Sequence, residues 1–187
     1  SGFRGEGVDT RGDMLNLLKA KDPDGLVRGW QSDIAEPQAP EGYDAVLLAY
    51  NVLSMMPSRQ AQVLCLTRAS GLLTPGGVLI VENATPHSVF AQLNERNQSL
   101  GVQFRDGNVG LNLGRYFPDE ERFLVRFLAF EDGTFVQRSG DLTLIHPETV
   151  RELVAAHGLS QVSLYSDWDG SAYRPGSQGF VATFRRT

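Results

Sequence analysis

Two apolar segments constrain the fold of this 187-residue chain more than any other feature. They are Ala45–Tyr50 and Val78–Glu82, and turn-forming residues flank both of them. A strand with one face in water alternates apolar and polar residues, whereas a strand buried on both faces is apolar almost throughout. The sequence therefore predicts a parallel sheet in which these two segments are strands buried on both faces.

Helical segments alternate with the strands of this sheet. The chain opens with a short strand that ends at Asp9, and a helix follows with Thr10 as its expected N-cap, in a capping box with Asp13. A second strand covers 26–30, and a second helix covers about 58–73, between the two apolar strands. The order strand, helix, strand, strand, helix, strand predicts an α/β fold with a Rossmann-like, doubly wound and mostly parallel sheet.

The second half of the chain has the pattern of antiparallel strands. Apolar segments flank Asp132-Gly133, which is a strong hairpin signal. A helix is expected from Pro147 to His157. The segments 162–165 and 180–184 are expected to close the sheet as an antiparallel C-terminal strand pair.

A chain of this length holds one hydrophobic core and is too short for two ordinary domains. We therefore expect a single domain over residues 1–187, in which residues 84–140 form an insertion on the substrate side. Within that insertion, the glycine-rich stretch from Gly107 to Gly114 is expected to be a flexible connection.

Composition and charge argue against several classes of function. The net charge is −5 and the basic residues are scattered, which argues against a nucleic-acid partner. The apolar segments are far shorter than a membrane span, so no membrane partner is expected. The single cysteine, Cys65, leaves no disulfide framework or cysteine-based metal site within one chain, and a buried, inert thiol is expected. No metal site and a cytoplasmic location are the resulting expectations.

Taken in order, several segments resemble the class I S-adenosylmethionine-dependent methyltransferase family, in particular its bacterial small-molecule branch. The resemblance covers nearly the whole chain, and no single motif carries it alone. The matching segments are Gly7–Thr10 with Met14–Leu15, Ser32–Ile34, Tyr43–Leu48, Leu73–Glu82, His146–Val150 with Gly158–Leu159, and Trp168–Ser171.

This resemblance implies an enzyme that transfers the methyl group of S-adenosylmethionine to a small-molecule acceptor and releases S-adenosylhomocysteine. An acid at the carboxyl end of the first strand can accept hydrogen bonds from both ribose hydroxyls, which gives Asp9 its expected role. The alternative is that Asp9 only caps the following helix. The resemblance implies that Asp33 accepts a hydrogen bond from the adenine amine while Ile34 packs on the ring. The other expected cofactor-binding residues are Thr10, Met14, Tyr50 and Asn51.

The acceptor is expected to bind between 87–116 and 167–173, because both segments follow strands and are rich in flexible and aromatic residues. His87 is the candidate general base for a hydroxyl acceptor. The residues expected to line the acceptor pocket are Tyr116, Trp168, Asp169 and Tyr173.

The sequence departs from the family in one respect. The family has a strand and a glycine-rich loop before the strand that carries the ribose acid, and only eight residues precede Asp9. We expect that strand to lie between the strand ending at Asp9 and the strand ending at Tyr50, in a part of the polypeptide before Ser1. Direct pairing of those two strands would contradict this expectation.

Two other functions fit the sequence. One is a non-catalytic binding or partner subunit with the same fold, which has lost the cofactor loop. The other is an NAD(P)-dependent oxidoreductase, because an acid after an early strand also suits the ribose of a nicotinamide cofactor. The methyl acceptor and the oligomeric state stay open, with a homodimer as one option.

Overall fold

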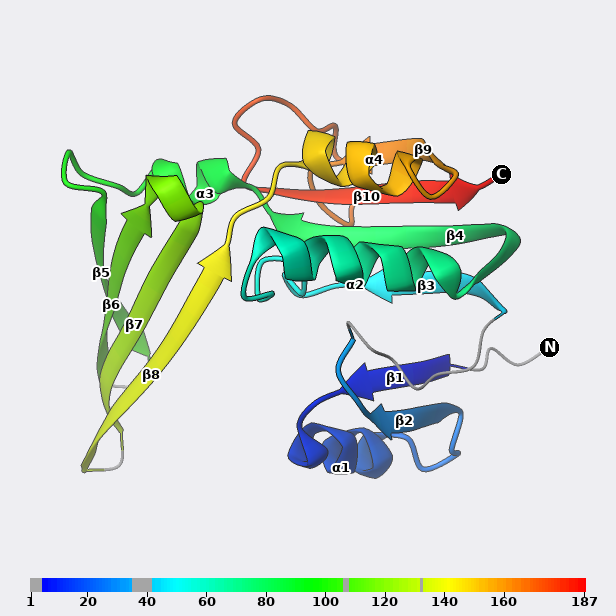
Figure 1. Cartoon of the computed structure of the whole chain (residues 1–187). Coiled ribbons are helices and arrows are strands. Elements are labelled where there is room, and N and C mark those ends of the chain that lie inside the picture. Colours follow the sequence, from blue (N-terminus) through cyan, green and yellow to red (C-terminus); the bar gives the residue numbers. More distant parts are fainter. Residues whose placement is uncertain (1–4, 35–41, 106–107, 132) are drawn as a thin grey trace.

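The computed structural model describes residues 5–34, 42–105, 108–131 and 133–187. The described strands form three sheets: β1–β2, then β3–β4–β10–β9, and finally β5–β6–β7–β8. Figure 1 shows them as a lobe of β1, α1 and β2, a central body, and an arm of four strands that extends from that body. No described helix is both long and apolar enough to cross a membrane.

The lobe is a parallel βαβ unit. Strand β1 (Gly5–Asp9) pairs in parallel with β2 (Val27–Gln31), and α1 (Gly12–Lys21) connects them. Leu15 and Leu18 of α1 lie over Gly29 of β2, which has no side chain to keep the helix away. The expected cap at Thr10 is wrong: the N-cap is Arg11, no side chain caps the helix, and Asp13 instead forms an ion pair with Arg11.

The central body holds the main hydrophobic core. Strand β3 (Tyr43–Leu48) pairs in parallel with β4 (Leu73–Ala84), and β10 (Gly179–Arg186) lies antiparallel between β4 and β9 (Leu159–Tyr165). The expected antiparallel C-terminal strand pair is therefore confirmed.

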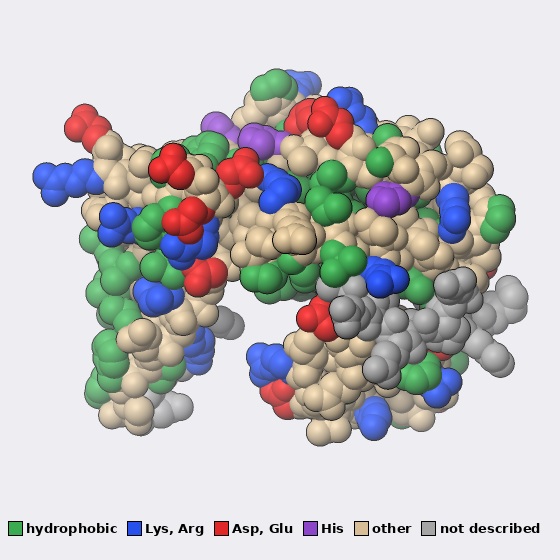
Figure 2. Space-filling model, in the orientation of Figure 1, with side chains coloured by type: hydrophobic (Ala, Val, Ile, Leu, Met, Phe, Trp, Pro, Cys, Tyr) green, Lys and Arg blue, Asp and Glu red, His purple; other side chains and the backbone are tan. Residues whose placement is uncertain are grey.

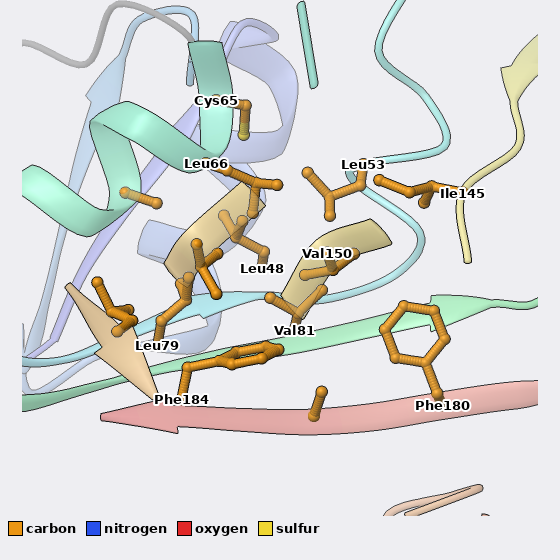
Figure 3. Packing of buried hydrophobic residues seen from close by; sticks show 14 of the residues in the cluster. Leu48, Leu53, Cys65, Leu66, Leu79, Val81, Ile145, Val150, Phe180 and Phe184 are labelled. Carbon is orange, nitrogen blue, oxygen red and sulfur yellow. The ribbon is translucent and has the colours of Figure 1, made fainter. Parts of the chain in front are cut away.

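Helices α2 (Arg59–Gly71) and α4 (Pro147–Ala155) cover one face of this sheet. Figure 3 shows Leu66 and Val150 pointing at Leu79, Phe180 and Phe184 of the strands. Ser58 caps α2 by accepting a hydrogen bond from the backbone N–H of Ala61 at 3.2 Å. The expectation of burial on both faces is wrong for β3 among the described residues, because the side chain of Leu47 is 55% exposed, whereas no residue of Val78–Glu82 in β4 is exposed.

The strands β1 and β3 are not hydrogen-bonded to each other, so each leaves one edge unpaired among the described residues. Figure 1 shows the two strands separated, with their arrows pointing the same way. A hydrogen bond from the Tyr43 hydroxyl to the Glu6 carboxylate links them at one point. The direct pairing that would contradict an intervening strand is not observed.

The arm is an antiparallel sheet that begins after the short helix α3 (Pro86–Phe90). Its strands are β5 (Gln98–Arg105), β6 (Asn108–Phe117), β7 (Arg122–Glu131) and β8 (Thr134–Thr143), with the 3-10 helix η1 (Pro118–Glu120) between β6 and β7. The expected β7–β8 hairpin is present and Gly133 has a φ of +77°, while Asp132 lies outside the described residues.

The expectation of a flexible connection from Gly107 to Gly114 is wrong for 108–114, because β6 occupies these residues, while Gly107 lies outside the described residues. Gly110 and Gly114 allow close packing of side chains against the sheet. A Cβ on Gly110 would stand 2.6 Å from the ring of Phe127, and one on Gly114 would stand 2.5 Å from the ring of Phe123. Each glycine therefore makes room for an aromatic ring of the neighbouring strand β7.

Candidate functional site

The loops expected to bind ligand gather at one edge of the structure. The arrows of β1, β2, β3 and β4 all point toward the arm in Figure 1, so their carboxyl ends face it. The space-filling view in Figure 2 shows an open cleft between the arm and the lobe. In α/β sheets, ligands bind outside the carboxyl ends of the parallel strands. The geometry therefore makes this edge the candidate site.

Asp9 is the last residue of β1 and is half-buried. Its Oδ1 accepts a hydrogen bond from the backbone N–H of Arg11 at 2.8 Å, and its Oδ2 has no hydrogen bond among the described residues. Because α1 begins at Gly12 with Arg11 as N-cap, the Asp9 carboxylate does not cap the helix. One carboxylate oxygen is held by the turn, and the other is available to a ligand hydroxyl.

The loop after β2 lies beside the main core. Ile34 packs against the core cluster, whereas Asp33 is exposed. Burial raises the pKa of the Cys65 thiol to about 12, and the nearby Asp33 carboxylate adds to this rise. Asp33 therefore lies near α2, and Cys65 is the buried, unreactive thiol expected from the sequence. Thr10 is exposed, and Met14 is 42% exposed on α1.

The loop after β3 is held in an unusual backbone conformation. Tyr50 and Asn51 have φ values of +59° and +61°, in the left-handed region that costs free energy for residues other than glycine. The N–H of Tyr50 donates to the Glu82 carboxylate, and the Oδ1 of Asn51 accepts from the N–H of Ala84. These bonds to the end of β4 fix the strained turn and leave the Tyr50 side chain 88% exposed at the candidate site.

Asn83 fixes the next turn of the same loop. Its side chain is completely buried, its Oδ1 accepts from the Ser54 N–H at 3.2 Å, and its Nδ2 donates to the Ser54 hydroxyl at 2.8 Å. Sequence reasoning missed Asn83, Ser54 and the role of Glu82. A signal was present, because Glu82, Asn83 and Ala84 directly follow an apolar strand at its carboxyl end.

A hollow of about 560 Å³ lies where β4 ends and β10 begins. Glu82, Asp167 and Asp169 give its lining three carboxylates. Hydrogen bonding from the Ser171 side chain, together with the hydrogen bond from the Ser171 N–H to Asp169 at 2.8 Å, lowers the pKa of the Asp169 carboxyl and keeps it ionised. The hollow is therefore acidic, and an uncharged or cationic group fits it better than an anion.

The expected acceptor residues do not form one cluster. Asp169 lines the 560 Å³ hollow, and the neighbouring Trp168 is 57% exposed. Tyr173 packs against the main core, where burial and then the nearby Glu148 raise its pKa. Tyr116 lies at the base of the arm, where its ring packs edge-on against the ring of Phe90, with the two ring centroids 5.0 Å apart.

His87 lies close to the rim of the 560 Å³ hollow. It is exposed on α3, and its Nε2 lies 3.7 Å from where a Cβ on Gly176 would stand. Gly176 is one of the residues that line the hollow. His87 therefore stands beside the hollow that Asp169 also lines, whereas His157 follows the C-terminal end of α4, with its Nε2 3.0 Å from the Thr67 hydroxyl. Among the described residues, no group of three or more His, Cys, Asp and Glu side chains could hold a metal ion.

The arm is fixed to the site through buried polar contacts. The N–H of Thr143, at the end of β8, donates to the Ser54 carbonyl at 2.8 Å, and its hydroxyl donates to the Met56 carbonyl at 2.9 Å. The fully buried Gln62 of α2 donates to the carbonyls of Leu53 and Thr143, both at 2.8 Å. The arm and the loop after β3 are therefore parts of one hydrogen-bonded unit.

The sequence matches no protein-family model, and its comparison with curated proteins gives no significant match. Solved structures match almost the whole chain. The CcbJ methyltransferase from Streptomyces caelestis has 21% identity and a TM-score of 0.87, over 97% of this chain and 74% of that protein. This chain has the fold of a class I methyltransferase.

Two further structures with this fold are similar. An S-adenosylmethionine-dependent methyltransferase from Clostridium acetobutylicum ATCC 824 has 12% identity and a TM-score of 0.84, over 98% of this chain and 75% of that protein. CalS10 from Micromonospora echinaspora is an amino pentose methyltransferase involved in calicheamicin biosynthesis, and its structure has S-adenosylmethionine bound. It has 21% identity and a TM-score of 0.69, over 98% of this chain and 74% of that protein. The described methyltransferase fold thus spans about three quarters of each of these proteins.

Proposed function

We propose that this protein transfers the methyl group of S-adenosylmethionine to a small-molecule acceptor. The observation that carries the proposal is the arrangement of Asp9, Asp33 and the Tyr50–Asn51 turn around the carboxyl edge of a sheet with the methyltransferase fold. Three proteins with that fold are methyltransferases by name, and CalS10 was solved with S-adenosylmethionine.

The described residues fit the nucleoside end of this cofactor. The Oδ2 of Asp9 can accept from a ribose hydroxyl, and Thr10 follows it at the surface. Asp33 is exposed and Ile34 is anchored on the core, which suits an adenine amine and an adenine ring respectively. Met14 is exposed enough on α1 to contact the same ring.

The turn after β3 fits the other end of the cofactor. S-adenosylmethionine, when bound, supplies a methyl group on a positively charged sulfonium. Glu82 holds the Tyr50 N–H and adds negative charge at this edge, which favours a cation there. The strained backbone of Tyr50 and Asn51 orients the turn, so that positioning is the main contribution of these residues to catalysis.

On the acceptor side we propose His87, Trp168 and Asp169 around the 560 Å³ hollow, with Tyr116 and Tyr173, which do not line it, as further acceptor contacts. The three carboxylates of the hollow favour an acceptor that is neutral or carries an amine over an acidic one. If His87 takes a proton from the acceptor, His87→Asn lowers kcat about 100-fold or more and leaves S-adenosylhomocysteine affinity unchanged. His157→Asn is the matched control, and equal activity of the two variants would remove His87 from the reaction.

We also propose that the polypeptide supplies a strand between β1 and β3. Both strands have an unpaired edge there, and buried backbone groups left without partners cost about 1–3 kcal/mol each. The exposed Leu47 face of β3 and the lack of any buried side chain in the described lobe point to the same additional cover. An intact mass near the 20.5 kDa of these 187 residues, with no second chain, would contradict this proposal. So would direct pairing of β1 with β3 in the intact protein.

Titration calorimetry of the intact protein separates the proposed function from its alternatives. A methyltransferase binds S-adenosylmethionine and S-adenosylhomocysteine and does not bind NAD(P). A partner subunit with the same fold binds none of the three, and an oxidoreductase binds NAD(P) alone. Either of the last two results would overturn the proposed function.

A further inference from the structure

One face of the arm carries a continuous apolar surface. Residues that alternate along a strand lie on the same face, and paired residues on neighbouring strands share that face. Leu100 pairs with Leu113, Val102 with Leu111, Phe104 with Val109, and Phe130 with Phe135. Leu111 also pairs with Leu128, two residues before Phe130, so all four pairs lie on one face. We call this set of eight residues the apolar face: Leu100, Val102, Phe104, Val109, Leu111, Leu113, Phe130 and Phe135.

Every one of these eight side chains is exposed. The exposed fraction reaches 81% for Phe104, 69% for Leu100 and 64% for Phe135, and it is at least 37% for the other five. Single exposed hydrophobic residues are common on protein surfaces, but a contiguous apolar surface of this kind marks a binding site. Figure 2 shows hydrophobic side chains along the outer side of the arm, which points away from the lobe and the cleft.

The other face of the same sheet is built differently. It mixes polar residues such as Gln103 and Asn112 with apolar ones, and the rings of Phe123 and Phe127 lie over its glycines. Phe123 is buried in a cluster with Val89 and Leu144 at the base of the arm. The apolar side chains of this second face are therefore buried or partly buried within the chain, whereas those of the apolar face are exposed.

We propose that the apolar face is the interface of a symmetric homodimer, in which the faces of two copies stack on each other. At about 150–200 Å² for a side chain of this size, the exposed fractions add up to roughly 800 Å². That area equals the roughly 800 Å² that each partner contributes to a standard stable interface. Two like sheets can pack face to face about 10 Å apart, and a two-fold axis brings the same face from both copies together.

Charge supports a second copy over a membrane surface. None of the eight side chains is charged. The charged residues on the same face of the sheet are Arg115, Arg122, Arg126 and Asp141, of which Arg122 and Asp141 form an ion pair with each other and Arg126 lies beside Leu113. The eight apolar side chains can therefore stack on their own copies without an ion among them being buried unpaired. A protein that binds anionic lipid needs a basic surface, whereas this chain has a net charge of −5.

Analytical ultracentrifugation of the intact polypeptide tests the proposal. The wild-type protein should have twice the mass of one polypeptide at micromolar concentration. The double variant Phe104→Glu/Phe130→Glu should weaken the dimer about 100-fold or more, because each copy then brings two charges into the interface. Val162→Glu is the matched control, since Val162 is 56% exposed on β9 and lies outside the apolar face. This control should remain dimeric.

The far-UV circular dichroism of each variant should match the wild type, because both substituted rings are more than half exposed. If the double variant loses this signal, Leu100→Glu alone on the edge strand replaces it. A wild-type protein with the mass of one polypeptide up to about 100 µM would overturn the proposal. The proposal would also be overturned if the charged variants weakened the dimer no more than Val162→Glu does. A monomeric protein that sediments with phosphatidylcholine–phosphatidylserine vesicles would overturn it as well.

Discussion

The central body and the lobe use the same kind of secondary structure but differ in how it is buried. The main core cluster lies in β3, β4, α2, α4, β9 and β10 and the segments that join them, and it includes fully buried side chains such as Leu66, Val150 and Phe184. In the described part of the lobe, residues 5–34, no side chain is fully buried. Both regions have parallel strands and a helix, but the strands of the lobe carry fewer apolar side chains than β3 and β4 do.

The residues of the candidate site are divided between the central body and the lobe. Tyr50, Asn51 and Glu82 stand on the well-packed body, whereas Asp9 stands on the lobe. The body can therefore position its residues by itself, and the lobe depends on contacts with other parts of the protein. The predictions that follow test this division by substituting residues in both regions.

The largest effect is expected in the body. Phe184 is completely buried among core residues, so Phe184→Ala should lower the free energy of unfolding by about 3–5 kcal/mol through lost contacts and a cavity. Urea unfolding measures this change. A loss below about 1 kcal/mol would mean that β10 does not belong to the cooperative core.

A second, smaller effect is expected for Asn83→Ala. This substitution leaves the buried Ser54 N–H without its acceptor and its hydroxyl without its donor, which should cost about 1–3 kcal/mol. Asn94→Ala is the control, because the exposed Asn94 also accepts two backbone hydrogen bonds. Urea unfolding should show a clearly larger loss for Asn83→Ala, and equal losses would contradict the positioning role of Asn83.

Local signals in the sequence predicted much of the body and the end of the arm. The helix expected over about 58–73 is α2, α4 begins at Pro147, and the two segments around Gly133 form a hairpin. These features depend on residues that lie close together in the sequence, so one sequence is enough to find them.

The features that were missed depend on contacts between distant segments. The strand β6 was interpreted as a flexible connection because its glycines were read as local flexibility, although Val109, Leu111 and Leu113 alternate as in a strand. Its glycines make room for rings of β7, which no local pattern reveals. In the candidate site, the Asn83–Ser54 contact joins residues 29 positions apart, and it was missed for the same reason.

In the lobe, Asp9 should contribute to cofactor binding. Asp9→Ala should weaken S-adenosylhomocysteine binding by about 10-fold to 100-fold, because a hydrogen bond to a carboxylate contributes about 1.5–3 kcal/mol. Asp13→Ala is the matched control, since Asp13 is an exposed aspartate of the same lobe that pairs with Arg11. Calorimetry should show no change for Asp13→Ala. Equal affinities for the two variants would remove Asp9 from the site.

The smallest effect is expected for Leu18→Ala on α1. Leu18 is only half-buried and packs against Gly7 and Gly29 within the lobe, so less apolar area is lost than at Phe184. The described contacts predict a loss below about 1 kcal/mol in urea unfolding. A loss as large as that of Phe184→Ala would show that the lobe unfolds together with the body. In that case a strand between β1 and β3 would have to join the two regions into one core, and the contrast between them would be confined to the described residues.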